Sequence, residues 1–236
     1  MKLIFLANIV SMIGSGMNQA GVIWFILQKT HSEASLGLLM MLQSLPALVL
    51  LPLSGVLIDR NDRRFVVMLL DALRLVIIAT VAVLALQHRA QLWHVYAMYV
   101  LVAAGFWVFW PTITALIQEL SPEDKFVHSN TFIMAGVQGG FLIAGALVGF
   151  IINSVGLGGV LVIDAATYVV SFACYFFVRR GKHLATAPQA STEARNFFHE
   201  LREGFRYLRA HPEFVPIGLC WSLFLSAMMS QGVVTA

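Results

Sequence analysis

The chain has 236 residues, of which 59% are hydrophobic and 11% are charged, and its formal net charge is +3 at pH 7. A soluble domain carries about 25% charged residues, so this composition excludes an ordinary soluble protein. The two cysteines, Cys174 and Cys220, lie inside apolar runs without the spacing of metal ligands, so we expect neither a disulfide framework nor a metal site.

Apolar runs of membrane-spanning length fill most of the chain. Each run has roughly 20 residues or more, enough for a helix to cross a hydrocarbon core of about 30 Å. Only helices and closed barrels satisfy the backbone in lipid, and these runs are too long for barrel strands. We therefore predict an all-α polytopic membrane helix bundle. Its predicted spans are Leu3–Leu27, Leu36–Ile58, Phe65–Leu86, Leu92–Ile117, Thr131–Ile152, Leu157–Val178 and Phe214–Ala236.

The lysines and arginines of the predicted loops are unevenly distributed between the two sides of the membrane. If the N-terminus is cytoplasmic, the outer side carries only Lys29 and Arg89. Because positively charged loops stay in the cytoplasm, we predict a multi-pass protein of the cell (inner) membrane with a cytoplasmic N-terminus. The cytoplasmic side then carries Lys2, Arg60, Arg63, Arg64, Lys125, Arg179, Arg180, Lys182, Arg195, Arg202, Arg206 and Arg209.

The densest charge lies in the stretch GVLIDRNDRR, from Gly55 to Arg64, between the second and third predicted spans. Gly55 would allow the second span to approach a neighbouring helix closely. Asp59 and Arg63 would lie one helical turn apart if the helix continued that far. One interpretation is that these charges only keep a short turn on the cytoplasmic side. The other is that the stretch takes part in a conformational change.

Ionisable side chains also lie inside the third and sixth spans, where a charge costs about 2.5–3.5 kcal/mol at mid-helix. Asp71 and Arg74 are three residues apart and face the same side, so they could form a structural pair or act directly in transport. Asp164 has no partner nearby in the sequence. It could support helix packing, or it could carry a proton as a coupling residue.

Glycines at a spacing of four residues mark the fifth span as a helix-packing surface. They form two small-xxx-small pairs, a pattern that lets membrane helices approach each other closely. These residues are Gly136, Gly140, Gly145 and Gly149.

The predicted domain division follows from one long loop after the sixth span. Residues 1–178 form an N-terminal six-helix transmembrane bundle, and residues 179–213 form a cytoplasmic linker. Within the linker, apolar residues at helical spacing oppose a charged face, which predicts an amphipathic helix on the membrane surface. Residues 214–236 form a seventh transmembrane span.

The stretch GVLIDRNDRR resembles the loop signature of the major facilitator superfamily. In order, that signature has a Gly, any three residues, an Asp, a basic residue, any one residue, a second Gly, an Arg and a final basic residue. In this chain, Asp62 stands where the family usually has the second Gly. The stretches SNTFIMAGVQGGFLIAGALVGFIINSVG and VIDAATYVVSFACYFF resemble spans five and six of its drug, macrolide and siderophore exporters. The matching signature residues are Gly55, Asp59, Arg60, Arg63 and Arg64.

The resemblance implies two six-helix halves, of which this chain supplies the first half and the start of the second, as expected of a chain truncated after span seven. It also implies that spans one, two, four and five line the substrate cavity, whereas spans three and six are peripheral. The loop signature, together with Asp71 and Arg74, would then be a conformational switch.

Candidates for the cavity are polar and aromatic residues inside the spans. Aromatic surface with a few uncharged polar groups suits amphipathic substrates, although the same residues could serve interhelical hydrogen bonding and lipid contact. These candidates are Asn18, Gln19, Gln43, Trp107, Trp110 and Gln138.

By resemblance we expect a secondary active transporter that exports drugs or other small amphipathic compounds by alternating access, coupled to protons. Catalytic and nucleotide-binding motifs are missing from the sequence, so we expect no enzyme, no cofactor and no nucleic-acid partner. The expected partners are the lipid bilayer, a small-molecule substrate, protons and the missing C-terminal half, from a longer chain or a separate one. The alternative is a truncated, non-transporting membrane protein or a half-bundle that needs a partner chain.

Overall fold

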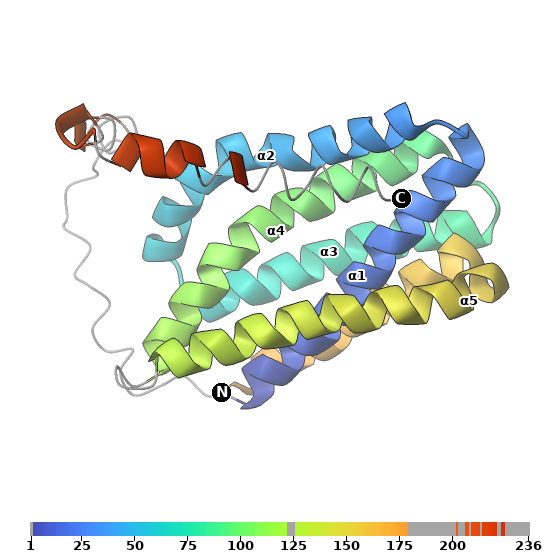
Figure 1. Ribbon diagram of the computed structural model, residues 1–236. Helices are drawn as coiled ribbons and strands as arrows, with labels where there is room; N and C mark the ends of the chain where they lie inside the picture. Colours follow the sequence, from blue (N-terminus) through green and yellow to red (C-terminus); the bar gives the residue numbers. More distant parts are fainter. Residues whose placement is uncertain are drawn as a thin grey trace. The chain divides into compact units, whose positions relative to one another are not determined.

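The computed structural model describes residues 2–121 and 126–178 and part of the stretch 202–224. The chain divides into two compact units, Met1–Ala187 and Pro188–Ala236. The first unit is built from helices (Figure 1), which confirms the predicted all-α bundle. They are α1 (Lys2–Thr30), α2 (Glu33–Arg60), α3 (Arg63–Leu86), α4 (Leu92–Leu120) and α5 (Phe126–Phe177).

Helix α5 combines the predicted fifth and sixth spans. Inside it, Gly156 has φ 63° and ψ −175°, a backbone conformation that glycine adopts at little cost. The chain turns back at this residue, and Figure 1 shows the two parts of α5 running in opposite directions. We call residues 126–155 the first arm of α5 and residues 157–177 its second arm.

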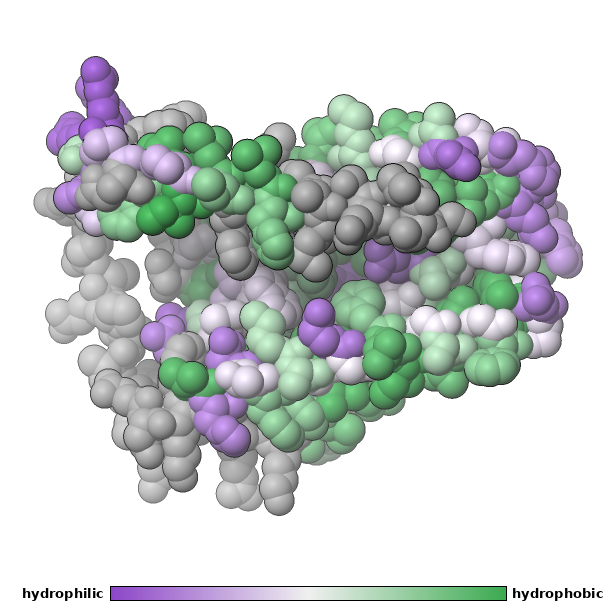
Figure 2. Space-filling model, in the orientation of Figure 1, coloured by the Kyte–Doolittle hydropathy of each residue, from purple (hydrophilic) through white to green (hydrophobic). Residues whose placement is uncertain are grey.

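The described helices of the first unit are long and apolar enough to cross a membrane. Many of their apolar side chains are exposed, for example Leu142 at 77% and Phe150 at 84%. Figure 2 shows hydrophobic residues over much of this face, with hydrophilic residues gathered at the right-hand end, where α1 connects to α2. Such an apolar surface fits a lipid environment.

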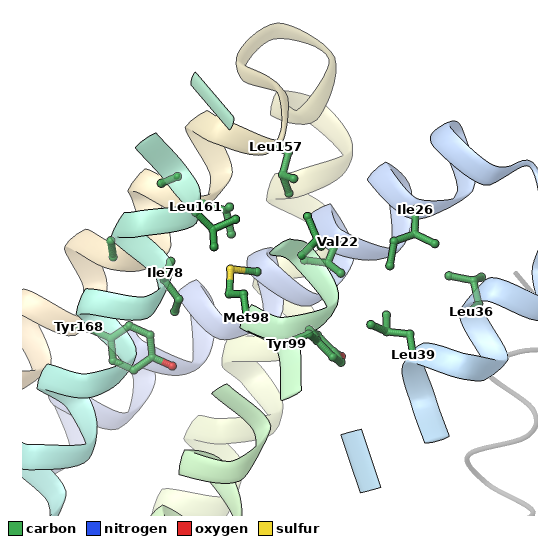
Figure 3. Packing of buried hydrophobic residues seen from close by; sticks show 14 residues of the cluster. Val22, Ile26, Leu36, Leu39, Ile78, Met98, Tyr99, Leu157, Leu161 and Tyr168 are labelled. Atoms are coloured by element: carbon green, nitrogen blue, oxygen red, sulfur yellow. The ribbon is translucent and has the colours of Figure 1, made fainter. Parts of the chain in front are cut away.

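One hydrophobic cluster joins all the helices of the bundle. Val22 of α1, Leu39 of α2 and Ile78 of α3 are fully buried in it, and Met98 of α4 and Leu161 of α5 meet them there (Figure 3). Because close packing of this kind fixes neighbouring helices against one another, the cluster positions the polar residues that lie beside it.

The connection between α2 and α3 is shorter than a helical turn. Helix α2 ends at Arg60 and α3 begins at Arg63, with extended backbone at Asn61 and Asp62 between them. Asp59 and Arg63 therefore lie on different helices, so the helix does not continue far enough for the one-turn relation between them.

Asp62 caps the start of α3. Its carboxylate accepts hydrogen bonds from the backbone amides of Arg64 and Phe65, at 3.0 and 3.3 Å. Aspartate is among the preferred residues at this position because its oxygens satisfy amides that have no partner inside the helix. The residue that departs from the loop signature thus has a local structural role.

In the second unit, residues 214–220 are helical. Of the predicted linker helix, residues 202, 206, 207, 209 and 210 are described and helical, whereas its predicted apolar face lies outside the described residues. Most of the predicted seventh span also lies outside them. The division into bundle, linker and seventh span therefore stays a prediction.

Candidate functional site

Two polar stripes meet between α1 and the second arm of α5. Each stripe repeats every three or four residues, so its members lie on one face of a helix. Nearly all of these side chains are buried. The α1 stripe is Asn8, Ser11, Ser15 and Asn18, and the α5 stripe is Asp164, Tyr168, Ser171 and Tyr175.

Hydrogen bonds connect the stripes at three levels, and we call these bonds the polar ladder. A buried hydrogen bond contributes about 0.5–1.5 kcal/mol, and a partner left alone costs more. The ladder therefore holds α1 and α5 in one register. Its bonds are Asn8 Nδ2 to Tyr175 Oη at 3.0 Å, Ser15 Oγ with Tyr168 Oη at 2.9 Å, and Asn18 Nδ2 to Asp164 Oδ2 at 2.7 Å.

Asp71 and Arg74 do not form the ion pair that their spacing would allow. Instead, Asp71 Oδ2 accepts a hydrogen bond from Ser171 Oγ at 2.7 Å. The guanidinium carbon of Arg74 lies 4.8 Å from the ring centre of Phe109 and 5.7 Å from that of Tyr168, within the range of cation–π attraction. Arg74 is 2% exposed, and within the described part of the chain its Nε and Nη2 have no acceptor.

A cavity of about 80 Å³ lies beside Arg74, and every helix of the bundle contributes to its wall. Phe106 of α4 and Phe141 of α5 form apolar parts of the wall. The polar part of the wall includes Ser15, Asn18, Gln19, Gln43, Arg74 and Tyr168.

The predicted cavity candidates separate into two groups. Asn18, Gln19 and Gln43 line the cavity, whereas Trp107, Trp110 and Gln138 are not part of its wall.

The candidates outside the wall have other surroundings. The Nε1 of Trp107 donates to the backbone carbonyl of Gln43 at 3.0 Å, which ties α4 to α2. Trp110 packs on a hydrophobic cluster, and Gln138 is exposed.

The third and sixth predicted spans also contribute to the wall of this cavity. Arg74 lies on α3 and Tyr168 on the second arm of α5, and both line the cavity. Asp71, Arg74 and Asp164 are buried, so α3 and the second arm of α5 place ionisable side chains inside the bundle.

The predicted packing glycines also fall into two groups, those that contact α1 and those that have no described neighbour. A Cβ at Gly136 would lie 2.9 Å from a ring carbon of Phe5, and one at Gly140 would lie 3.0 Å from Met12 Cβ, so both glycines pack against α1. Open space surrounds the remaining predicted packing glycines, for which no described atom lies within 4 Å of an added Cβ. These are Gly55, Gly145 and Gly149.

Arg63 connects the start of α3 to the last turns of α4. Its Nη1 donates to the carbonyl of Ala115 at 3.2 Å and lies 3.4 Å from Glu119 Oε2. A cation is unfavourable at the start of its own helix but favourable at the end of another, where carbonyls carry partial negative charge. Arg63 therefore stabilises the contact between α3 and α4, although its charge is unfavourable for α3 alone.

Arg64 makes the corresponding contact with the end of α5. Its Nε donates to the carbonyl of Tyr175 at 2.7 Å, and its Nη2 donates to the carbonyl of Phe176. Arg63 and Arg64 thus hold three helix ends together. The side chains of Asp59 and Arg60 lie outside the described residues.

Replacing Arg64 with lysine should loosen the contact between α3 and the end of α5. Lysine keeps the charge but lacks the planar fork that reaches two carbonyls at once. Loss of one charge-assisted hydrogen bond at this partly exposed site should cost about 1 kcal/mol, measured as a lower Tm of the purified protein. The exposed Arg89 provides the control, since Arg89→Lys should leave the Tm unchanged; an equal Tm for both variants would contradict the proposed contact.

Sequence reasoning missed most of the polar ladder. The detectable signal was small or aromatic polar residues recurring every three or four positions in spans one and six. The missed residues are Asn8, Ser11, Ser15, Tyr168, Ser171 and Tyr175. Groups of His, Cys, Asp or Glu suited to a metal ion are not found in the described portion of the chain.

Comparison with known proteins adds the family context. A sequence model described as the Major Facilitator Superfamily matches residues 4–236. The "Uncharacterized MFS-type transporter YfiS" of Bacillus subtilis is 28% identical over 206 residues, covering 86% of this chain and 48% of the relative. Macrolide efflux protein A of Streptococcus pyogenes is 23% identical over 226 residues, covering 96% of this chain and 55% of the relative. The chain thus spans about half the length of the curated relatives it matches.

Proposed function

The chain belongs to the Major Facilitator Superfamily, and we propose that the protein is a secondary active transporter that exports drugs or other small amphipathic compounds in exchange for protons. It is a multi-pass membrane protein. We further propose that it lies in the cell (inner) membrane with a cytoplasmic N-terminus, because the predicted cytoplasmic loops carry most of the lysines and arginines.

The cavity between the membrane-spanning helices is the observation that carries this proposal. Its wall combines phenylalanine rings with amide, hydroxyl and guanidinium groups. Sites for small molecules are typically apolar with a few well-placed polar groups, and an amphipathic compound matches that combination. The macrolide efflux relative supports export as the direction.

The arginines at the helix ends support alternating access. In such a cycle, one half of a transporter rocks against the other around a central site. The contacts of Arg63 and Arg64 with the ends of α4 and α5 would keep this bundle rigid while it moves. The loop signature would then stabilise one state of the cycle rather than contact substrate.

Proton coupling needs a group in the spans that can bind and release a proton. Asp71 and Asp164 are fully buried, and each leaves its Oδ1 without a hydrogen-bond partner within the described helices. A carboxylate inside a membrane bundle is costly unless it is used. We propose Asp164 as the coupling residue because it bonds Asn18, which lines the cavity.

A susceptibility panel tests this function. The gene, taken with any reading frame that continues beyond codon 236, is deleted and overexpressed in a host exposed to amphipathic antibiotics, dyes and detergents. Overexpression should raise, and deletion should lower, the inhibitory concentration of at least one class. Unchanged susceptibility across the panel, with the protein present in the membrane, would argue against export of such compounds.

A further inference from the structure

Arg74 is the most unusual side chain of the cavity wall. It carries a charge at 2% exposure, and its Nε and Nη2 have no acceptor among the described residues. Asp71 and Asp164 lie within electrostatic range of the guanidinium, but they leave these two nitrogens without an acceptor, and a buried donor without an acceptor is costly unless a further group satisfies it. The rings of Phe109 and Tyr168 attract its face, but cation–π contact does not replace hydrogen bonds for its N–H groups.

The neighbouring carboxylates do not take this role. Asp71 bonds Ser171 and Asp164 bonds Asn18, and neither carboxylate forms an ion pair with Arg74 in the described bundle. Neither carboxylate belongs to the cavity wall, whereas Arg74 does. The charge that the wall presents is therefore positive.

The rest of the wall is neutral. Gln19 and Gln43 contribute amides, and Ser15 and Tyr168 contribute hydroxyls. These groups can orient a polar ligand, but they add no charge that would compete with the guanidinium. A site of this composition favours ligand groups that accept several hydrogen bonds and carry negative charge.

We propose that the cavity binds the anionic head group of an amphipathic substrate and that Arg74 is the specificity-determining residue. The proposal rests on the transport function proposed above and names the charge class of its substrate. Pockets for drug-sized ligands measure roughly 300–1,000 Å³, whereas this cavity measures about 80 Å³. It therefore fits a carboxylate- or sulfonate-sized group, with the apolar part of the ligand outside it.

Two probes with one scaffold and permanent, opposite charges test the preference. They are 4-phenylbutane-1-sulfonate and (4-phenylbutyl)trimethylammonium, whose charges do not change with pH. The full gene product is purified into nanodiscs of phosphatidylcholine, so that no anionic lipid competes for the site. Binding is measured by calorimetry, and we expect the sulfonate to bind more tightly than the ammonium probe.

Arg74→Gln should reduce sulfonate affinity by about 10- to 100-fold, the range for losing hydrogen bonds to a charged group. The sulfonate affinity of Arg74→Lys should lie between those of the unsubstituted protein and Arg74→Gln, because lysine keeps the charge but lacks the planar guanidinium fork. Arg89→Gln, which removes an exposed cation, should leave both affinities unchanged. Tighter binding of the ammonium probe, or sulfonate affinity that Arg74→Gln does not alter, would overturn the proposal.

Gly105→Ala provides a second variant in case Arg74→Gln does not fold. A Cβ at Gly105 would lie 3.0 Å from Arg74 Nε and 3.6 Å from its Cγ, so it would displace the guanidinium without removing its charge. We expect several-fold weaker sulfonate binding and unchanged ammonium binding; unchanged sulfonate binding would count against Arg74.

The binding experiment tests the charge preference of the cavity, and the susceptibility panel tests transport, so each proposal can be contradicted without the other. Export without any charge preference would overturn this inference and leave the transport function standing. Selective sulfonate binding that depends on Arg74, in a protein that exports nothing, would support the site and reject the transport function.

Discussion

Replacing Gly14 with leucine should leave little folded protein in the membrane. A Cβ at this position would lie 2.1 Å from Thr167 Oγ1 and 2.5 Å from Asp164 Oδ1, well inside contact distance. The clash lies between α1 and the second arm of α5, beside the polar ladder. Helix α1 would have to move away, and the ladder bond from Asn18 to Asp164 would break. The measurement is the yield of monodisperse protein after extraction from the membrane.

The same substitution elsewhere provides the control. Gly37 of α2 has no described atom within 4 Å of an added Cβ, so Gly37→Leu should give a normal yield. Gly14→Ala should be intermediate, because a methyl group needs a smaller displacement than an isobutyl group. If Gly14→Leu were extracted as well as Gly37→Leu, the close contact between α1 and α5 would be wrong.

The helices could be predicted from the sequence because their signal is local. Run length is a property of neighbouring residues, and it predicted the first six spans, which the described helices match. The predicted fifth and sixth spans end and begin on either side of Gly156, where the chain turns. Asp62 shows the limit of this local reading, since its departure from the signature was visible but its role as a helix cap required the backbone geometry.

The site could be predicted only in part because its pairings are not local. Spacing alone joined Asp71 to Arg74, whereas the fold supplies Ser171, a hundred positions away, as the partner of Asp71. Gly14 was overlooked because one glycine in an apolar span has no pattern of its own. Its role depends on Thr167, on a helix that the sequence does not place beside α1.

Replacing Asp164 with asparagine should abolish proton-driven export but leave counterflow of substrate intact. Asparagine has nearly the shape of aspartate, and its carbonyl oxygen can still accept from Asn18, as Asp164 Oδ2 does at 2.7 Å. The contact between α1 and α5 is therefore kept. The amide does not take up a proton, so the cycle loses its coupling. Uphill transport into inverted vesicles under a proton gradient should fall to the level of vesicles without the protein.

Asp71→Asn is the matched control, because Asp71 is equally buried and its bond with Ser171 can also be kept by an amide. If Asp164 alone couples transport, Asp71→Asn should retain uphill export. Normal uphill export by Asp164→Asn would exclude it as the coupling residue. Loss of counterflow together with uphill export would instead assign Asp164 to packing, because counterflow needs a folded, mobile bundle but no proton. The two assays therefore separate the two roles that the sequence left open for this carboxylate.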